Sequence, residues 1–200
     1  MAGLINVEAA IAVLDGGGIV AVPTDTVYGF AAEIHHPTAV LTLFAMKHRP
    51  VTQGLPVLID SVDQISHLGV KWGGDARRLG DAFWPGALTI VVDVPHELAG
   101  RVGNLTDTIG FRIPDEPILR RMIAVLGPLA VSSANLHGEA PCYSAQEVLA
   151  RFGDREELEG VIDDGERSGE VSTVVDLSGA TWRMLREGDI TRDQIEQALA

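Results

Sequence analysis

The stretch that decides the fold is GGGIVAVPTDTVYGFAA, residues 16–32. Its two flanks are runs of small and apolar residues, which are typical of buried strands. Between them stand Thr24, Asp25 and Thr26, two hydroxyls and a carboxylate at a point where a buried strand would continue. Polar side chains in such a place need hydrogen-bond partners, which either a local turn or a bound ligand can supply. The stretch therefore predicts two neighbouring strands with a polar segment between them.

The composition is that of a globular protein with one core. Of the 200 residues, 46% are hydrophobic and 22% are charged, which favours a single domain over residues 1–200. Cys142 is the only cysteine, so no disulfide framework exists and a reducing compartment is expected. The N-terminal segment lacks a basic region and carries Glu8 and Asp15, and no apolar run is long enough to span a bilayer. We therefore expect a cytoplasmic protein without membrane association.

The net charge of −13 argues against one class of function. Binding along nucleic acid requires a basic surface, so direct binding of nucleic acid is expected to be weak or absent. The total charge does not exclude a local basic cavity. With only 15 Lys and Arg residues in the chain, the candidates for such a cavity are the cations that gather near glycines and prolines.

Helix and strand patterns alternate along the chain. Strands occur singly between helices and also in adjacent pairs, which favours a mixed sheet covered by helices on both faces over a strictly doubly wound sheet. We expect Asn6, Ser61 and Asp115 to cap helices, and Pro50 to end one. The expected helices are 6–18, 36–50, a short one from 61, 116–127, 144–153 and 191–200, and the expected strands are 18–23, 28–34, 55–60, 87–94, 108–114, 127–133, 173–177 and 181–188.

Motifs that fix a nucleotide or a metal are absent from the sequence. Neither GxGxxG nor GxxxxGK[ST] occurs, so the two standard nucleotide fingerprints do not apply. HExxH and CxxC are also missing, and the six histidines show no metal-ligand spacing. No protein-bound metal is therefore expected.

Two segments place cations where an anion could bind. Lys47 and Arg49 follow an apolar helix and converge only if that helix ends between them; solvated cations at a helix C-terminus are the plain alternative. Arg112 lies in a strand between Phe111 and Ile113, where a guanidinium needs an anionic partner. That partner is either a buried Asp or a ligand carboxylate gripped in bidentate fashion, and we favour the ligand.

Other predicted strand ends carry small polar side chains. Residues 131–135 end a strand with hydroxyls and an amide, which is a common ligand rim, although a polar loop has the same composition. Residues 171–176 and 185–188 each place hydroxyls or an arginine at a strand end. Trp-Pro-Gly at 84–86 is interpreted as a structural corner with its tryptophan in the core.

Taken together, these segments resemble the YrdC-like family, the threonylcarbamoyl-AMP synthases. The resemblance runs from about Gly17 to Gly188, and although each piece alone is unspecific, seven pieces in the right order are specific. The pieces are Pro-Thr-Asp-Thr-x-Tyr-Gly, Lys-x-Arg-Pro, Trp-Pro-Gly-x-Leu-Thr, Gly-x-Arg-x-Pro, Ser-Ala-Asn, Ser-Thr-Val-Val-Asp and Leu-Arg-x-Gly, beginning at residues 23, 47, 84, 110, 133, 172 and 185.

The resemblance implies a fold and a reaction. The implied fold is α/β, a three-layer α-β-α arrangement with a mixed, twisted sheet like that of YrdC and RibB, in a single domain with a deep central cavity. The implied reaction joins L-threonine, bicarbonate and ATP into threonylcarbamoyl-AMP and pyrophosphate. Its product feeds a tRNA threonylcarbamoyl transferase complex that makes N6-threonylcarbamoyladenosine (t6A). ATP is thus a substrate, Mg²⁺ is carried by the nucleotide, and no enzyme nucleophile is needed.

The resemblance also implies two adjoining sites. The threonine site consists of Thr24, Arg112, Val131 and Ser172, with the arginine on the substrate carboxylate. The ATP site consists of Lys47, Arg49, Thr108, Ser133, Asn135 and Arg186. The first two residues of the ATP site are the catalytic pair, because they would neutralise the charge that develops on the phosphates.

The chain departs from the family pattern in a few places. Gln53-Gly54 stands where the family often has Asn-Pro, and His137 and Pro141 stand where it has serines. A related enzyme that forms a carbamoyl-adenylate with another acceptor would fit such changes. A double-stranded RNA-binding module is the alternative from another class, and the net charge disfavours it.

Overall fold

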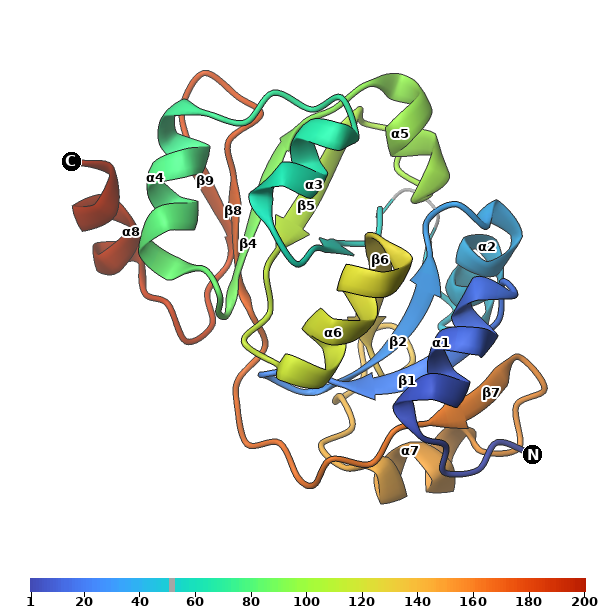
Figure 1. Ribbon diagram of the computed structural model, residues 1–200. Coiled ribbons are helices and arrows are strands. Elements are labelled where there is room, and N and C mark those ends of the chain that lie inside the picture. The colour runs from blue at the N-terminus through green and yellow to red at the C-terminus, as the bar shows by residue number, and fades with distance from the viewer. Residues whose placement is uncertain (51–52) are drawn as a thin grey trace.

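A computed structural model describes residues 1–50 and 53–200 of the chain. The strands are β1 Ile19–Pro23, β2 Tyr28–Glu33, β3 Val57–Leu58, β4 Leu88–Asp93, β5 Thr108–Arg112, β6 Leu129–Ser133, β7 Leu158–Val161, β8 Thr173–Asp176 and β9 Arg183–Arg186. Within the described part they form one sheet in the order β7-β1-β2-β6-β3-β5-β4-β8-β9 (Figure 1). Pairs β7/β1, β3/β5 and β4/β8 are parallel and the others are antiparallel, so the prediction of a mixed sheet is confirmed.

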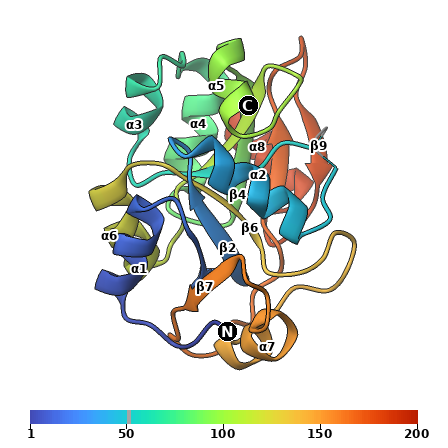
Figure 2. The ribbon, with the colours of Figure 1, turned by 90° about the vertical axis from the view of Figure 1, so that its right-hand side faces the viewer.

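Helices cover both faces of this sheet. They are α1 Val7–Asp15, α2 Pro37–Met46, α3 Val62–His67, α4 Gly74–Phe83, α5 His96–Arg101, α6 Pro117–Leu126, α7 Ala145–Phe152 and α8 Arg192–Leu199. Figure 2 shows α1 and α6 on one side of β2 and α2 on the other. None of the helices described is both long and apolar enough to cross a membrane.

Strand β1 shows why helices must pack on both faces of the sheet. Because successive side chains of a strand point to opposite faces, Val20 and Val22 pack with α1 and α6, whereas Ile19 and Ala21 pack in the larger core that includes α2. All the residues of β1 and β2 are buried. A strand buried on both faces reads as a continuous apolar run, which is the pattern that the sequence displays. The predicted α/β fold with helices on both faces is therefore confirmed.

The stretch quoted first forms an antiparallel hairpin. Its register pairs Val20 with Ala31 and Pro23 with Tyr28, so residues 24–27 make the connection. The polar segment is therefore the turn of a buried hairpin, and the hairpin fixes its position relative to the sheet.

Helix α2 ends earlier than predicted. It ends at Met46, with Lys47 as its C-cap, and not at Pro50. The residue that leaves the helix is His48, whose φ of 51° lies in the left-handed region. The left-handed residue His48 therefore separates the two cations. Burial lowers the pKa of Lys47, and the charge of Arg49 still lies near enough to lower it further.

Two predicted helix caps are also corrected. Glu116, not Asp115, is the N-cap of α6, and its Oε1 accepts a hydrogen bond from the Ile118 amide at 3.1 Å. Ser61 occupies the N-cap position of α3, but its side chain makes no capping bond there. Gln64 accepts from the amide of Asp60 at 2.8 Å, one residue before the N-cap, so neither bond of the expected reciprocal cap forms.

The Trp-Pro-Gly corner forms, and its tryptophan packs against the edge of the core without being fully buried in it. Trp84 is half-buried, and its ring stacks on Trp72 at 5.1 Å between centroids. Its indole nitrogen donates to the carbonyl of Leu88 at 2.7 Å. The corner is thus held by a surface stack and one hydrogen bond, and it leads directly into β4.

Candidate active site

A cavity of about 380 Å³ lies where the two halves of the sheet meet. Its walls come from the β1–β2 turn and from strands β3, β4, β5, β6, β8 and β9. Most of the predicted site residues line it, namely Thr24, Arg49, Thr108, Arg112, Val131, Ser133, Ser172 and Arg186. Lys47 and Asn135 do not line it, although they lie directly behind one of its walls. Segments far apart in sequence therefore converge on one cavity.

Both threonines of the hairpin turn line this cavity, but their hydroxyls differ in how many hydrogen bonds they make within the chain. The Thr24 hydroxyl donates to the carbonyl of Val27 at 2.6 Å and accepts from the amides of Thr26 and Val27, both at 3.1 Å. These bonds close the turn on itself. The Thr26 hydroxyl contacts only the Thr24 hydroxyl, at 3.0 Å, and Arg112 at 3.5 Å within the described chain. Thr24 therefore shapes the wall, and Thr26 has the hydroxyl with spare hydrogen-bonding capacity.

Arg112 has a buried Asp as its partner, which is one of the two alternatives that the sequence left open. Its Nη2 lies 2.5 Å from Oδ1 of Asp25, and its Nε donates to the carbonyl of Gly86 at 2.9 Å. The side chains of Arg112 and Asp25 are only 7% and 12% exposed, so the pair is largely shielded from water. Arg112 nevertheless lines the cavity, whereas Asp25 does not. The guanidinium is thus held by a buried Asp and also faces the space where a ligand would bind.

Two further arginines reach the same cavity. Arg49 donates to the carbonyls of Gln53 and Gly54 at 2.8 and 3.1 Å, and Arg186 donates to the carbonyl and hydroxyl of Ser172 at 2.8 and 3.0 Å. Burial lowers the pKa of both, and the positive charges of Arg112 and Arg49 lower the pKa of Arg186 further. The positive charges of Arg112 and Arg49 therefore act on Arg186 across the cavity.

The cavity lacks negative charge of its own. No Asp or Glu of the described residues lines it, and none lies within 4.0 Å of the charged nitrogens of Arg49 or Arg186. No group of three or more His, Cys, Asp or Glu in the described chain could hold a metal ion. A protein of net charge −13 thus holds an electropositive cavity, which suits one or more anions.

Lys47 is buried behind the wall that Ser133 forms. Its Nζ donates to the carbonyl of Ser133 and to the carbonyl and Oδ1 of Asn135, the latter two at 2.7 and 3.0 Å. These three acceptors match the three donors of an ammonium group. Burial, with a smaller effect of the neighbouring Arg49 charge, lowers the pKa of Lys47 to about 7. Ser133 also donates to Oδ1 of Asn135 at 2.6 Å, so the three side chains form one network.

Two of the departures from the family pattern lie away from the cavity. His137 and Pro141 do not line it, and His137 is exposed. Gly54 does line it, and a Cβ at this position would lie 2.7 Å from Cβ of Asn104. The chain therefore keeps a small residue where the loop approaches Asn104, and the loop carbonyls hold Arg49.

The sequence did not single out several lining residues. Asn104 accepts from the amide and hydroxyl of Thr106 at 3.1 and 2.8 Å, and both side chains line the cavity next to Thr108. The available signal was the polar run 104–108 before an apolar strand, the same pattern that marked the hairpin turn. Thr89 is a second omission, because it sits inside a β-branched strand and looks like core.

Comparisons with known proteins identify the family of this chain. The Sua5_yciO_yrdC family model, described as "Telomere recombination", matches residues 12–188. A Mycobacterium tuberculosis protein is 35% identical over 195 residues, which are 97% of this chain and 89% of that protein. A Vibrio campbellii protein named threonylcarbamoyl-AMP synthase is 31% identical over 186 residues, 92% of this chain and 99% of its own.

A solved structure shows the same fold with a ligand. The structure of Pyrococcus abyssi Sua5 complexed with L-threonine superposes with a TM-score of 0.87 at 32% identity, and it covers 99% of this chain and 60% of that longer chain. The family model spans far more than half of the residues, and several relatives exceed 30% identity over nearly the whole chain. The predicted family is thereby confirmed: this chain belongs to the Sua5/YciO/YrdC family.

Proposed function

We propose that this protein is a threonylcarbamoyl-AMP synthase, a nucleotidyltransferase that makes threonylcarbamoyl-adenylate and pyrophosphate from L-threonine, bicarbonate and ATP. The observation that carries the proposal is the convergence of Arg49, Arg112 and Arg186 on one cavity without a lining carboxylate. The substrates bring a carboxylate and a triphosphate, which are the anions that guanidinium groups bind in bidentate geometry. The name of the Vibrio relative and the threonine in the Pyrococcus structure support the same reaction.

The residues divide between the two substrates by position. Arg112 takes the carboxylate of threonine, with the Thr24 turn, the backbone of Val131 and the Ser172 hydroxyl around the amino acid. Arg49 and Arg186 take the phosphates of ATP. The polar residues Thr108 and Ser133 complete the nucleotide side, and Asn135 supports it from behind the wall through its bond with Ser133. This division is the one that the family resemblance implies, and all three arginines line the one cavity.

Lys47 can contact a phosphate of ATP only if it gives up one of its present hydrogen bonds. Its ammonium is bonded to Ser133 and Asn135, so it reaches a phosphate only by exchanging at least one of these oxygens for a phosphate oxygen. The exchange replaces a hydrogen bond to a neutral oxygen with a stronger one to a charged phosphate oxygen. Lys47 then neutralises charge on the phosphates together with Arg49.

The chemistry needs positioning more than an enzyme nucleophile. The amine of threonine attacks the carbon of CO₂ derived from bicarbonate and loses a proton, which gives a carbamate. A carbamate oxygen then forms a bond to the α-phosphorus of ATP while the bond to pyrophosphate breaks. The carbamate is labile in water, so an enclosed cavity protects it.

Several features outside the cavity belong to the same proposal. Mg²⁺ arrives on the triphosphate, because no carboxylate in the described lining would hold it. The chain acts as one domain over residues 1–200 in the cytoplasm. Its product passes to a tRNA threonylcarbamoyl transferase complex, and the protein itself does not hold tRNA.

Pyrophosphate release tests the proposal. With ATP, Mg²⁺ and bicarbonate present, release is expected to depend on L-threonine and to stop when bicarbonate is removed. A panel of other amines separates the related enzyme that uses another acceptor, because that enzyme would release pyrophosphate with its own acceptor and not with threonine. Release that is indifferent to threonine would contradict the proposal.

A further inference from the structure

Asp25 is the charged residue of the hairpin turn, and neither substrate site gives it a role. It does not line the cavity, yet its carboxylate lies 2.5 Å from Nη2 of Arg112. Arg112 is its only ion-pair partner within the described chain. A side chain that contacts the site solely through an arginine acts, if at all, by holding that arginine.

The contacts of Arg112 leave a defined part of its guanidinium for a ligand. A guanidinium has five N–H donors. The described chain takes one on Nε with the carbonyl of Gly86, one on Nη2 with Asp25, and one on Nη1 with the Thr26 hydroxyl at 3.5 Å. One donor on Nη1 and one on Nη2 remain. Two donors on the terminal nitrogens are what a carboxylate needs for bidentate binding.

Both anchors of Arg112 are themselves rigid. The amide of Gly86 donates to the carbonyl of Ile113 at 2.9 Å, and a Cβ at Gly86 would lie 2.7 Å from the carbonyl oxygen of Phe83. The hairpin turn that carries Asp25 is closed by the Thr24 hydroxyl. The Trp-Pro-Gly corner and the Pro-Thr-Asp-Thr turn therefore hold the same side chain from two directions.

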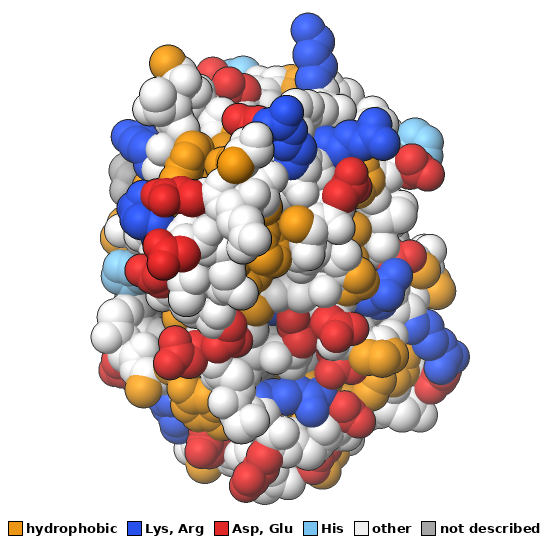
Figure 3. All heavy atoms as spheres, turned by 90° about the vertical axis from the view of Figure 1, so that its left-hand side faces the viewer, with side chains coloured by type: hydrophobic (Ala, Val, Ile, Leu, Met, Phe, Trp, Pro, Cys, Tyr) orange, Lys and Arg blue, Asp and Glu red, His pale blue; other side chains and the backbone are white. Residues whose placement is uncertain are grey.

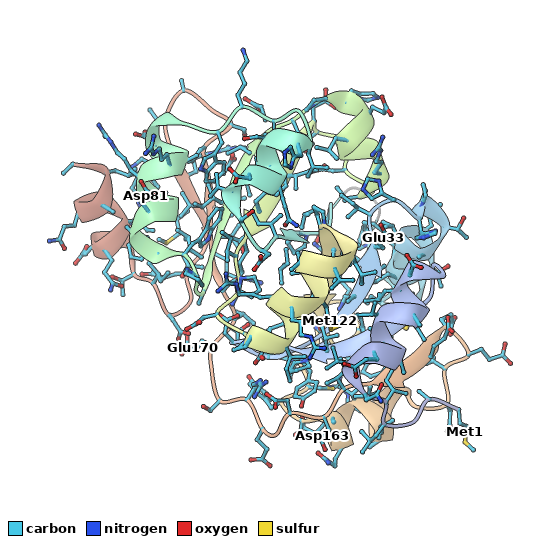
Figure 4. All side chains as sticks on the ribbon, in the orientation of Figure 1. Met1, Glu33, Asp81, Met122, Asp163 and Glu170 are labelled. Atoms are coloured by element: carbon cyan, nitrogen blue, oxygen red, sulfur yellow. The ribbon has the colours of Figure 1, made fainter. Side chains whose placement is uncertain are left out.

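A third segment supports the turn from outside. A Cβ at Gly169 would lie 3.1 Å from Cα of Thr26 and 3.2 Å from the carbonyl oxygen of Asp25, so this part of the chain lies directly against the turn. In Figure 4, the labelled Asp163 and Glu170 mark the two ends of this stretch, which crosses from β7 towards β8. The turn thus has little room to move Asp25 away from the arginine.

From this geometry we propose that Asp25 is a positioning residue, which orients Arg112 so that its free donors meet the carboxylate of the amino-acid substrate. The inference rests on the proposed function, because it names what the Arg112 end of the cavity binds. The charge of Asp25 opposes a substrate carboxylate, so positioning and repulsion make opposite predictions. If positioning dominates, removal of Asp25 weakens threonine binding; if repulsion dominates, removal strengthens it.

The test compares threonine with L-threoninol, which has a hydroxymethyl group in place of the carboxylate. In Asp25→Asn an uncharged oxygen still accepts from Arg112, and in Asp25→Ala no acceptor remains. The KM for threonine is expected to rise about fivefold in the Asn variant and about tenfold or more in the Ala variant, since a bond to a charged group is stronger than a neutral one. The KM for ATP and the inhibition constant of threoninol stay within twofold of wild type.

A matched control is Asp176→Asn. Asp176 is a buried carboxylate that also lies 2.5 Å from an arginine, Arg183, but neither residue lines the cavity. This variant is expected to leave the KM for threonine unchanged. If Asp25→Ala does not fold, Asp25→Asn alone tests the proposal, because its expected fivefold rise in the KM for threonine is large enough to measure.

The outcomes separate the inference from the function on which it rests. An unchanged or lower KM for threonine in Asp25→Asn overturns the positioning role, and so does an equal loss for threonine and threoninol. Failure of the wild-type protein to release pyrophosphate in response to threonine overturns the proposed function instead. That measurement precedes the comparison of variants.

Discussion

Arg112 shows at the scale of one residue how an ambiguous pattern resolves. The apolar strand around it required an anionic partner, and the sequence offered either a buried Asp or a ligand. The structure supplies the Asp and leaves donors of the same guanidinium facing the cavity. The sequence could not choose because the partner, Asp25, is 87 residues away and comes near only through the sheet.

Replacement of Arg112 is expected to separate the two substrates. Arg112→Ala removes the grip on the carboxylate, so the KM for threonine is expected to rise about a hundredfold while that for ATP changes little, because a charged bidentate pair contributes several kcal/mol. Steady-state kinetics with each substrate varied in turn provides the measurement. Arg183→Ala, an arginine paired with Asp176 outside the cavity, is the control. Equal losses for both substrates would show a structural role.

Lys47 predicts a pH dependence of stability. Its pKa of about 7 lies below the ordinary 10.5 because burial disfavours its charged form. Between these values the unfolded chain binds more protons than the folded one, so the free energy of unfolding rises with pH. The free-energy cost of burying the charged ammonium is fully present below about pH 7 and decreases as the pH rises towards 10.5.

Urea unfolding of the wild type and of Lys47→Met checks this expectation. The wild type should gain about 1 to 2 kcal/mol relative to the variant between pH 7 and pH 8.5, since a full pH unit is equivalent to about 1.4 kcal/mol. Subtracting the free energy of unfolding of the variant from that of the wild type removes the contributions of other titrating groups. One such group is Cys142, whose pKa is raised by burial. Parallel stability curves would show that Lys47 is charged in both states over this range.

At the scale of elements, most strands were predictable, whereas β7 and α4 were not. The expected strands at 18–23, 28–34 and 87–94 were apolar or β-branched runs bounded by Gly or Pro, and β1, β2 and β4 form there. Strand β7, by contrast, has only four residues with a glycine among them, and it forms by parallel pairing with β1. Helix α4 was missed because it begins at a glycine, without a capping side chain.

Gly188, which follows β9, lies so close to the segment before β8 that we expect it not to tolerate a side chain. A Cβ at Gly188 would lie 1.9 Å from the carbonyl oxygen of Val171, next to cavity-lining Ser172. Gly188→Ala must therefore displace backbone at the cavity wall, and it is expected to cost about 1 to 3 kcal/mol of stability together with most of the activity.

Thermal unfolding and pyrophosphate release measure both effects for this variant. Gly100→Ala, in α5 with nothing within 4 Å of the added Cβ, is the matched control and is expected to keep wild-type stability and activity. Wild-type behaviour of Gly188→Ala would mean that the contact with Val171 is not as close as described.

At the scale of the whole molecule, charge is segregated between surface and cavity. The chain carries −13 overall, and on the face shown in Figure 3 acidic and basic side chains are interspersed without a continuous basic patch. The arginines that line the cavity contribute positive charge where no lining carboxylate of the described chain offsets it. Small anions can enter such a cavity, whereas a duplex backbone would meet the acidic exterior.

This arrangement predicts opposite results for small and large polyanions. Calorimetry should detect pyrophosphate binding that weakens as salt increases, because the cavity charges are partly screened. A gel-shift experiment with tRNA at near-physiological salt should show no complex. A salt-sensitive tRNA complex under those conditions would revive the RNA-binding alternative.

The candidate site was predictable as a set of residues but not as an arrangement. Ordered motifs pointed to the residues that line the cavity, because polar groups at strand ends stand out against apolar runs. The sequence could not place Lys47 behind the wall, since this depends on where α2 ends. It also could not assign Asp25, whose partner lies on a distant strand.

The most direct test of the central claim follows the carbon atom of bicarbonate. The protein is incubated with ¹³C-bicarbonate, L-threonine, ATP and Mg²⁺, quenched rapidly, and the nucleotides are analysed by mass spectrometry. The account predicts threonylcarbamoyl-AMP that carries the label, formed in equal amount to pyrophosphate and strongly reduced in Arg112→Ala. A labelled adenylate that forms equally well without threonine, or no labelled adenylate at all, would contradict it.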